Sequence, residues 1–358
     1  MSRRLVSDLA ATHAAWRIPA ASVAAIRTAL GAGWEVVEVR TPAVSAGDGG
    51  AGGGGGGGRE EAAAAARGAE IYLGFGVPDG VLAAGRGTLR WAHSGTAGVG
   101  SSLPSLRGTG VVLTNSAGVH AEPMADWVIT AIGYFARGLD RAVEAQARRR
   151  WIKEEVEQLA IPVRELRDLR VGILGLGGIG TAVMRRALAL GMSVAAVRRR
   201  PERGGPGGTR DGGGETGALR WVGGLDELPR LAAESDCLVI AAPHTTATAG
   251  AVSRQVLERL PRHAVVINVS RGSLLDEAAL LELIEAGRLR GAALDVFGVE
   301  PLPPEHPFWG HPRVLVSPHV SAVTNRFWER ETGLIVDNIG RYLAGASLTN
   351  VVDLEAGY

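Results

Sequence analysis

The sequence predicts an α/β protein with two domains, each built on a doubly wound parallel sheet. Three observations lead to this fold class. Short apolar runs alternate with helix-like stretches along most of the chain, the pattern of parallel sheets covered on both faces. The length, 358 residues, exceeds what a single core normally fills. Finally, residues 120–151 have helical periodicity for some 30 residues and separate two such α/β series.

Composition excludes several classes of protein. The chain has 38 basic and 37 acidic residues, so no global charge favours nucleic acid or an anionic membrane, and neither is expected as a partner. No apolar run approaches the roughly 20 residues of a membrane span, and the first residues lack the apolar centre of a secretory signal. We therefore expect a cytoplasmic protein. Cys237 is the single cysteine and lies in an apolar run, which predicts a buried thiol and no multi-cysteine metal site.

The first α/β series indicates a small domain with five strands. The expected strands are 3–9, 34–39, 69–75, 89–94 and 110–115, with helices near 20–31 and 79–85. Between the second and third strands lies a tract rich in glycine, which we interpret as a flexible surface loop over 47–58 because a homopolymer lacks the spacing of a phosphate-binding turn.

The second series indicates a complete dinucleotide-binding sheet. Six strands are expected, at 169–177, 192–198, 236–243, 264–270, 292–297 and 314–319. They are separated by helices near 179–190, 225–233, 253–260 and 276–287. The last forty residues read as one amphipathic helix and a tail, and we expect this helix to pack back on the first domain.

A glycine-rich turn follows the first strand of the second series. Gly175, Gly177 and Gly180 have the spacing G-x-G-x-x-G between an apolar strand and a helix. The first glycine permits a tight turn, the second lets backbone approach a pyrophosphate, and the third lets helix and strand pack closely. Gly178 and Ile179 then open a helix whose N-terminal N–H groups favour phosphate. This context predicts binding of NAD(H) or NADP(H).

Three arginines, Arg198, Arg199 and Arg200, stand where a carboxylate would hold the ribose 2′-hydroxyl of NAD. A guanidinium offers a planar fork of donors to the 2′-phosphate of NADP, with Arg198 and Arg199 the expected contacts. The sequence therefore favours NADP(H). NAD(H) stays open, because Glu202 can bend back to the ribose and a second flexible glycine-rich loop is expected over 203–214.

Polar residues follow the carboxyl ends of the later strands, where ligands of such sheets bind. They are His244, Arg271, Asp295, Glu300 and His319. Arg271 comes directly after an apolar strand, a costly place for a charge unless an anion lies there, so we interpret it as a clamp for a substrate carboxylate. With Glu300 near it in the fold, His319 becomes a general acid whose cationic form the carboxylate stabilises.

These motifs together resemble the D-isomer-specific, NAD(P)-dependent 2-hydroxyacid dehydrogenases. The similarity runs through LRWAHSGTAGVG, TNSAGVHAEPMADWVI, GILGLGGIG, VINVSRGSLLDEAAL, ALDVFGVEPLPPEHPFW and SPHVSA, in that order. It implies two Rossmann-like domains with a cleft between them. The substrate domain, flavodoxin-like, is expected over 1–121 plus 322–358, and the NAD(P)-binding domain over 122–321.

The resemblance also implies roles for single residues. Arg271 would grip the carboxylate and carbonyl of a 2-oxo acid, His319 would protonate the new alkoxide, and Glu300 would keep His319 cationic. Asp295 would bind the nicotinamide carboxamide. Further contacts implied to cofactor and substrate are those of Pro243 and His244, and of the backbone at Ala97 and Gly98. Members of the family are typically homodimers, built through the cofactor domain and its long entry helix.

The stretch GMSVAAVRRRP resembles the glyoxylate/hydroxypyruvate reductase group, so reduction of a small 2-oxo acid to a D-2-hydroxy acid is the leading hypothesis. Two alternatives remain. One is a phosphoglycerate dehydrogenase without a regulatory domain, and the missing ribose acid counts against it. The other is a nucleotide-sensing binding protein of the same fold, against which the complete set Arg271, Glu300 and His319 argues.

Overall fold

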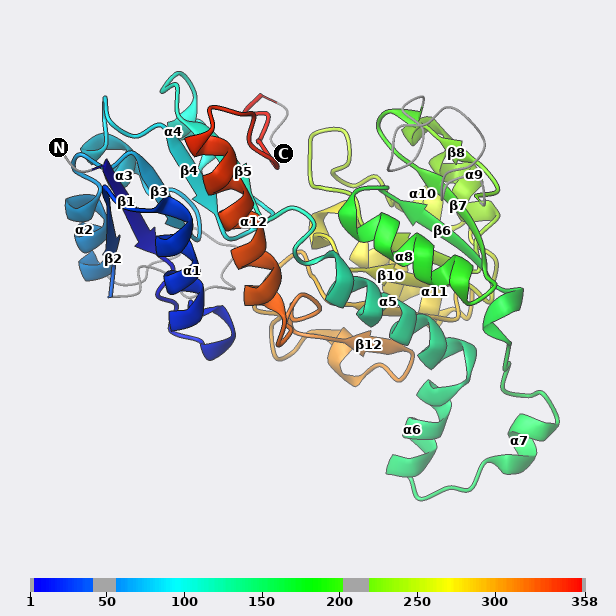
Figure 1. The fold of residues 1–358 in the computed structure, drawn as a ribbon. Helices are drawn as coiled ribbons and strands as arrows, with labels where there is room; N and C mark the ends of the chain where they lie inside the picture. Colours follow the sequence, from blue (N-terminus) through cyan, green and yellow to red (C-terminus); the bar gives the residue numbers. More distant parts are fainter. Residues whose placement is uncertain (1–2, 41–55, 202–218, 356–358) are drawn as a thin grey trace. The chain divides into compact units, whose positions relative to one another are not determined.

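The computed structural model describes residues 3–40, 56–201 and 219–355 (Figure 1). The chain divides into two compact units. The first comprises Met1–His120 and Val323–Tyr358, and the second comprises Ala121–Ala322. Each unit contains one wholly parallel sheet with helices on both faces, which confirms the predicted fold class.

The first unit is built on five parallel strands, each inside a run expected from the sequence. They are β1 (Arg3–Asp8), β2 (Trp34–Glu38), β3 (Ile71–Gly74), β4 (Trp91–Ser94) and β5 (Val112–Asn115). Their order, β2-β1-β3-β4-β5, is that of flavodoxin-like sheets. The short 3-10 helix Ala14–Trp16 follows β1, and the remaining elements are α1 (Ala20–Leu30), α2 (Gly56–Ala65), α3 (Asp79–Ala84), α4 (Leu103–Leu106) and α12 (Phe327–Leu343).

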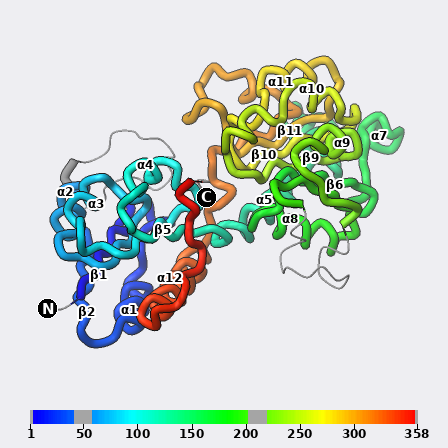
Figure 2. The backbone as a smooth tube through the Cα atoms, turned by 90° about the horizontal axis from the view of Figure 1, so that it is seen from above, coloured from blue at the N-terminus to red at the C-terminus, as the bar shows by residue number. Residues whose placement is uncertain are grey.

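Alternation of apolar residues along these strands builds two cores. Leu5 and Ile71 pack with α1 and α12 on one face, whereas their neighbours Val6 and Tyr72 pack with α2 and α3 on the other. Helices α1 and α12 lie side by side, as Figures 1 and 2 both show. The C-terminal helix therefore packs on the first unit.

The expected glycine-rich loop at 47–58 differs from the structure at its end. Residues 56–58 open α2, while 47–55 lie outside the described residues. The alanine-rich segment that follows has high helix propensity, and glycine is tolerated in a first turn whose N–H groups have no intrahelical partner. The second expected loop, 203–214, lies wholly outside the described residues, as does Glu202.

The second unit is built on seven parallel strands. They are β6 (Arg170–Leu174), β7 (Ser193–Val197), β8 (Val222–Gly223), β9 (Cys237–Ile240), β10 (Val265–Asn268), β11 (Gly291–Leu294) and β12 (Val314–Val316), in the order β12-β11-β10-β9-β6-β7-β8. The chain order reverses between β6 and β9, as in dinucleotide-binding sheets. Its helices are α5 (Ala121–Ala136), α6 (Leu139–Ala147), α7 (Lys153–Glu157), α8 (Gly178–Ala189), α9 (Leu228–Ala233), α10 (Arg254–Leu257) and α11 (Glu277–Glu285), and the 3-10 turns are Leu166–Asp168, Leu225–Glu227, Gly272–Leu274 and Pro307–Gly310.

Helices cover both faces of this sheet. Figure 2 shows α10 and α11 on one side, and α5 and α8 on the other. Ile173 and Val239 pack toward α5 and α8, whereas Leu174 and Ile240 pack toward α9, α10 and α11. Successive strand residues thus enter opposite cores, so the strands read as continuous apolar runs.

The structure corrects two expectations for the second unit. The helical segment expected over 120–151 contains two helices, α5 and α6. Gly138 lies between them in a left-handed conformation (φ +66°), which interrupts the helical backbone. A seventh strand, β8, was not expected, because two residues at a sheet edge leave no periodicity to detect. No helix within 3–40, 56–201 or 219–355 is long and apolar enough to cross a membrane.

Candidate active site

The glycine turn between β6 and α8 has the geometry that its spacing indicates. Gly175 has φ +102°, and a Cβ there would lie 2.7 Å from Ala242 Cα. A Cβ on Gly180 would lie 1.9 Å from the Gly175 carbonyl oxygen, so only glycine lets α8 approach the turn this closely. At Gly177 a Cβ would meet nothing within 4 Å. The turn is therefore tightly packed at Gly175 and Gly180 and has free space beside Gly177.

The N-terminus of α8 is available for an anion. Gly177 is the N-cap and provides no side chain, and the first turn, which contains Gly178 and Ile179, has no acidic residue. The N-terminal N–H groups of a helix and its dipole favour negative charge at such a position. The helix has 12 residues, so the peptide dipoles of several turns add to the partial positive charge at this terminus.

The arginines follow β7 directly. The backbone N–H of Arg198 donates to the carbonyl oxygen of Gly223 at 2.9 Å, so the edge strand β8 fixes where the arginine run begins. The Arg199 side chain is exposed, and Arg198 and Arg200 are partly exposed. The run thus lies at the carboxyl end of β7, the edge at which the glycine turn also lies.

Arg271 lies at the carboxyl end of β10, one residue before the 3-10 turn Gly272–Leu274. Its side chain is largely exposed, and its Nη1 donates to the Ser270 carbonyl oxygen at 2.7 Å. The Asn268 side chain donates to the Arg271 carbonyl oxygen at 3.0 Å. A Cβ on Gly272 would lie 1.9 Å from the Phe297 carbonyl carbon, so glycine lets this segment pass against the one that leads to Glu300.

Glu300 and His319 form a hydrogen-bonded pair. Glu300 Oε2 and His319 Nδ1 are 2.7 Å apart, and each side chain is about one-third exposed. The other carboxylate oxygen, Oε1, accepts from the backbone N–H of Phe297 at 2.8 Å. Burial raises the pKa of Glu300, but the hydrogen bonds from His319 and Phe297, with the nearby charges of His319 and Arg271, outweigh burial and lower it overall. The structure thus brings Arg271, Glu300 and His319 together.

The turn that carries His319 is held by Asp295. This carboxylate is fully buried and accepts from Ser317 Oγ at 2.6 Å and from the backbone N–H groups of Val320 (2.9 Å) and Ser321 (3.0 Å). His319 itself has φ +54°, a left-handed conformation that is costly for a residue with a Cβ and is typical of functional sites. Oδ2 accepts only one of these bonds, so Asp295 keeps acceptor capacity, and its contact with a nicotinamide stays a prediction.

A second acid near the pair was not predicted. Glu277, at the start of α11, accepts from the Gly298 backbone N–H at 2.8 Å. Burial raises the pKa of Glu277, and the charge of Glu300 raises it further. In the sequence, the only sign of this second acid is the acidic pair Asp276–Glu277, five residues after Arg271. We read that pair as a helix start, and Asp276 does cap α11 by accepting from Ala279 N.

The other predicted residues lie on loops. Pro243 and His244 follow β9 and are exposed, and the Pro243 carbonyl oxygen accepts from Thr248 Oγ1 at 2.7 Å. Ala97 and Gly98 belong to the first unit, between β4 and α4, and are exposed. Among the described residues, no group of three His, Cys, Asp or Glu side chains is placed to hold a metal ion.

Comparison with known proteins identifies the family. The model of the NAD binding domain of D-isomer specific 2-hydroxyacid dehydrogenases matches residues 129–321. A glyoxylate/hydroxypyruvate reductase A from Yersinia enterocolitica is 31% identical over 266 residues, which are 74% of this chain and 75% of that protein. The reductase of the same name from Serratia proteamaculans is 31% identical over 286 residues, 80% of each chain.

Solved structures agree with these matches. A D-isomer specific 2-hydroxyacid dehydrogenase from Xanthobacter autotrophicus, solved with NADPH and MES, has a TM-score of 0.75 and 30% identity, with all of both chains covered. An NADPH-dependent glyoxylate/hydroxypyruvate reductase from Sinorhizobium meliloti, solved with NADP and sulfate, has a TM-score of 0.72 and 25% identity, covering 99% of this chain and 100% of that one. The chain belongs to the D-isomer specific 2-hydroxyacid dehydrogenase family and is an NAD(P)-dependent oxidoreductase.

Proposed function

We propose that the protein reduces a small 2-oxo acid to the D-2-hydroxy acid with NADPH, and that glyoxylate or hydroxypyruvate is the preferred substrate. The observation that carries this proposal is the grouping of Arg271, Glu300 and His319 in the second unit, where a cation, a carboxylate and an imidazole meet. The relatives that are about 31% identical are named glyoxylate/hydroxypyruvate reductases, which supports this choice of substrate.

The residues present fit a dinucleotide cofactor. The open side of Gly177 and the uncapped N-terminus of α8, with Gly178 and Ile179, suit a pyrophosphate. Arg198 and Arg199 suit the 2′-phosphate of NADP(H), and the solved relatives described with NADPH or NADP support this preference over NAD(H). Gly175, Gly180, Pro243, His244 and Asp295 complete the proposed cofactor site. When bound, the nicotinamide supplies the hydride that adds to the substrate carbonyl carbon.

The protein's own side chains supply charge and a proton. Arg271 binds the substrate carboxylate and polarises the carbonyl, because its guanidinium presents donors in a planar fork. His319 donates Nδ1–H to Glu300, which directs Nε2 to the substrate, and none of the described residues accepts a hydrogen bond from Nε2. As the carbonyl π bond breaks, the Nε2 proton passes to the oxygen, and Glu300 stabilises the imidazolium before transfer. The backbone around Ala97 and Gly98 is proposed as a second contact for the substrate carboxylate.

Each unit then has its own task. We assign substrate recognition to residues 1–121 with 322–358, and cofactor binding to residues 122–321. A homodimer in the cytoplasm is the expected form of the protein. In the second unit, the apolar side chains of Trp151 (89% exposed) and Leu159 (74% exposed) are available to such an interface.

Steady-state kinetics test the proposal. The purified protein is assayed with NADPH and NADH against glyoxylate, hydroxypyruvate, pyruvate and a bulky 2-oxo acid. We expect the highest kcat/KM with NADPH and one of the first two acids. Greater activity on 3-phosphoglycerate would favour a phosphoglycerate dehydrogenase. Cofactor binding without turnover on any of these acids would favour a nucleotide-sensing protein and refute the proposal.

Arg271→Ala provides the matched test of the site. Its side chain carries the proposed clamp, whereas the glycine turn and the arginines at 198 and 199 are left intact. We expect turnover to be lost while NADPH binding, measured by fluorescence titration, changes little. An active variant would contradict the assignment of Arg271.

A further inference from the structure

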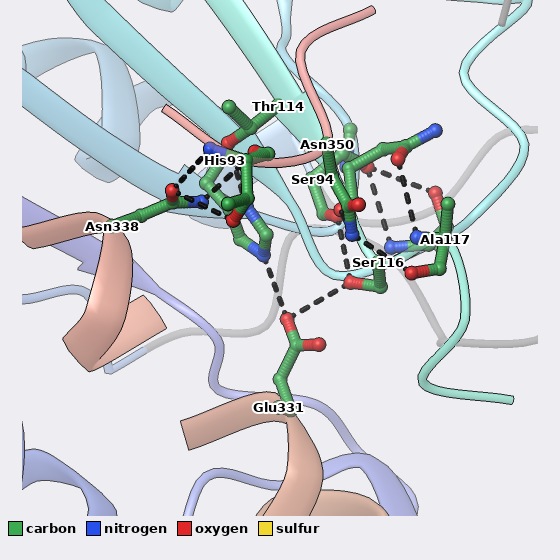
Figure 3. A network of polar contacts seen from close by, with 12 residues as sticks. His93, Ser94, Thr114, Ser116, Ala117, Glu331, Asn338 and Asn350 are labelled. Carbon is green, nitrogen blue, oxygen red and sulfur yellow. Dashed lines mark hydrogen bonds and ion pairs between the residues drawn. The ribbon is translucent and has the colours of Figure 1, made fainter. Parts of the chain in front are cut away.

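A buried polar network in the first unit joins α12 to the carboxyl ends of β4 and β5 (Figure 3). The side chains of Glu331 on α12 and His93 on β4 are both fully buried, and Glu331 Oε1 lies 2.8 Å from His93 Nε2. Ser116 Oγ lies 3.0 Å from the same carboxylate oxygen. Burying a carboxylate and an imidazole costs more than packing apolar side chains of similar size, so their presence calls for a role beyond stability.

The network continues from His93 into the sheet. His93 Nδ1 lies 2.8 Å from Thr114 Oγ1, which also accepts from Trp91 Nε1 at 2.8 Å. Both ring nitrogens of the histidine are thus used, which fixes the orientation of the ring. The second oxygen of Glu331, Oε2, is buried and has no hydrogen-bond partner within the described part of the chain. A buried carboxylate oxygen without a hydrogen-bond partner lowers stability.

The network ends on the loop over residues 94–98. Ser116 Oγ also lies 3.0 Å from the Ser94 carbonyl oxygen, so its single hydrogen has two acceptors within reach, Glu331 Oε1 and Ser94 O. Four contacts engage the carbonyl oxygens of this loop: Ser116 Oγ with Ser94 O (3.0 Å), Ser116 N with Thr96 O (3.3 Å), Asn115 Nδ2 with Ala97 O (2.8 Å), and Thr96 Oγ1 with Gly98 O (2.8 Å). The loop's acceptors are therefore held by the end of β5 and by the loop itself.

Gly95 N and Thr96 N of this loop donate to Gly74 O (2.8 Å) and Ser94 Oγ (3.4 Å), but the backbone donors at its end are left open. In the described structure, the backbone N–H groups of Ala97, Gly98 and Val99 donate to no acceptor, and Ala97 and Gly98 are exposed. Successive backbone N–H groups without an acceptor in the protein are available to bind an anion. The substrate of the proposed reaction carries a carboxylate, which is such an anion.

We propose that Glu331, acting through His93 and Ser116, is a positioning residue that fixes the 94–98 loop for binding of the substrate carboxylate. This inference rests on the proposed function. A positioning role of this kind predicts an effect on the KM of the 2-oxo acid. The hydride and proton transfers depend on other residues, so kcat and NADPH affinity should change little.

The test uses Ser116→Ala, which removes only the link between Glu331 and the loop. We expect the KM for glyoxylate to rise about fivefold to tenfold, the effect of losing one hydrogen bond, with kcat within about twofold of the wild type. The matched control is Thr332→Val, on the next residue of α12. Thr332 Oγ1 donates to Ser22 Oγ of α1 at 2.7 Å, so this variant loses one hydrogen bond of the same helix without touching the loop.

Two substitutions of Glu331 separate geometry from charge. Glu331→Gln keeps an oxygen that can accept from His93 and Ser116, and we expect a KM close to that of the wild type. Glu331→Ala leaves His93 without its buried partner, and we expect the larger increase in KM where the variant folds. If it does not fold, the comparison of Ser116→Ala with Thr332→Val decides.

Amide hydrogen exchange of the peptide over 94–100 gives a readout that does not depend on activity. We expect faster exchange in Ser116→Ala and unchanged exchange in Thr332→Val. Unchanged KM and exchange in Ser116→Ala, or equal effects in both variants, would overturn the inference. A wild-type protein without turnover on any 2-oxo acid would instead refute the proposed function, and the exchange experiment would still decide whether the network holds the loop.

Discussion

Asp8, at the carboxyl end of β1, makes the stability of the first unit depend on pH in an unusual direction. Its side chain is buried, and Tyr72 Oη donates to its Oδ2 at 2.6 Å. Burial raises the pKa of Asp8 from 3.8 to about 6, although the hydrogen bond from Tyr72 lowers it in part and the charge of Glu61 raises it. The native state therefore binds a proton more tightly than the unfolded state does.

The sign and size of the effect follow from linkage. The contribution of Asp8 to the free energy of unfolding is fully present below pH 3.8 and is lost as the pH rises through about 6. The difference between the two pKa values corresponds to about 3 kcal/mol, of the order of a third of the stability of a typical domain. Asp8→Asn replaces the carboxyl with a neutral amide that can still accept from Tyr72, so this loss should disappear.

Urea unfolding of the wild type and Asp8→Asn, followed between pH 4 and pH 7.5, measures the effect. We expect the difference in the free energy of unfolding, Asp8→Asn minus wild type, to increase as the pH rises, by up to about 3 kcal/mol. Glu60→Gln, which removes an exposed carboxylate from α2 in the same unit, controls for the loss of one negative charge. Tyr72→Phe should move the transition to higher pH. A difference between wild type and Asp8→Asn that stays constant over this range would refute the reasoning.

Three further predictions concern the second unit. Glu300→Gln should lower kcat/KM by about 10²-fold to 10³-fold at pH 7 with little change in NADPH binding, because His319 loses its carboxylate partner; steady-state kinetics and fluorescence titration check this. Arg198→Ala with Arg199→Ala should weaken NADPH binding by about tenfold to a hundredfold and leave NADH binding nearly unchanged, so that equal losses for both cofactors would contradict the assignment. Cys237 should resist thiol reagents at pH 8 in the native protein and react after unfolding, because burial raises its pKa to about 12.

Much of this structure could be predicted from the sequence because the signals are local. Each strand of the second unit except β8 is a short run of apolar residues, and polar residues such as Arg271 and His319 follow those runs at once. Parallel strands bring their carboxyl ends to one edge, so residues far apart in sequence can be assigned to one site without coordinates. Glu300 was found in the same way, from its place after the β11 run.

The remainder depends on pairings that no local pattern contains. His93 and Glu331 are 238 residues apart, and their contact requires both the order of strands in the first unit and the return of α12 to its sheet. His93 stands inside an apolar strand and Glu331 inside an amphipathic helix, so each alone is read as an ordinary polar residue. Glu277 was missed for a related reason, since its contact with the Gly298 backbone depends on how closely Gly272 lets two segments pass.

Under the proposed function, the two units fix their functional groups in opposite ways. In the second unit the reacting groups are side chains that hydrogen bonds to the backbone hold in place: the Phe297 N–H holds Glu300, and Asp295 holds the turn of His319 through the N–H groups of Val320 and Ser321. In the first unit the ligand-binding groups are backbone N–H groups, and buried side chains hold the loop that presents them. Substitutions that disturb the proton-transfer pair Glu300 and His319 should therefore act on kcat. Substitutions in the first unit should act on KM and on the choice of 2-oxo acid, because they move the loop without altering the chemistry.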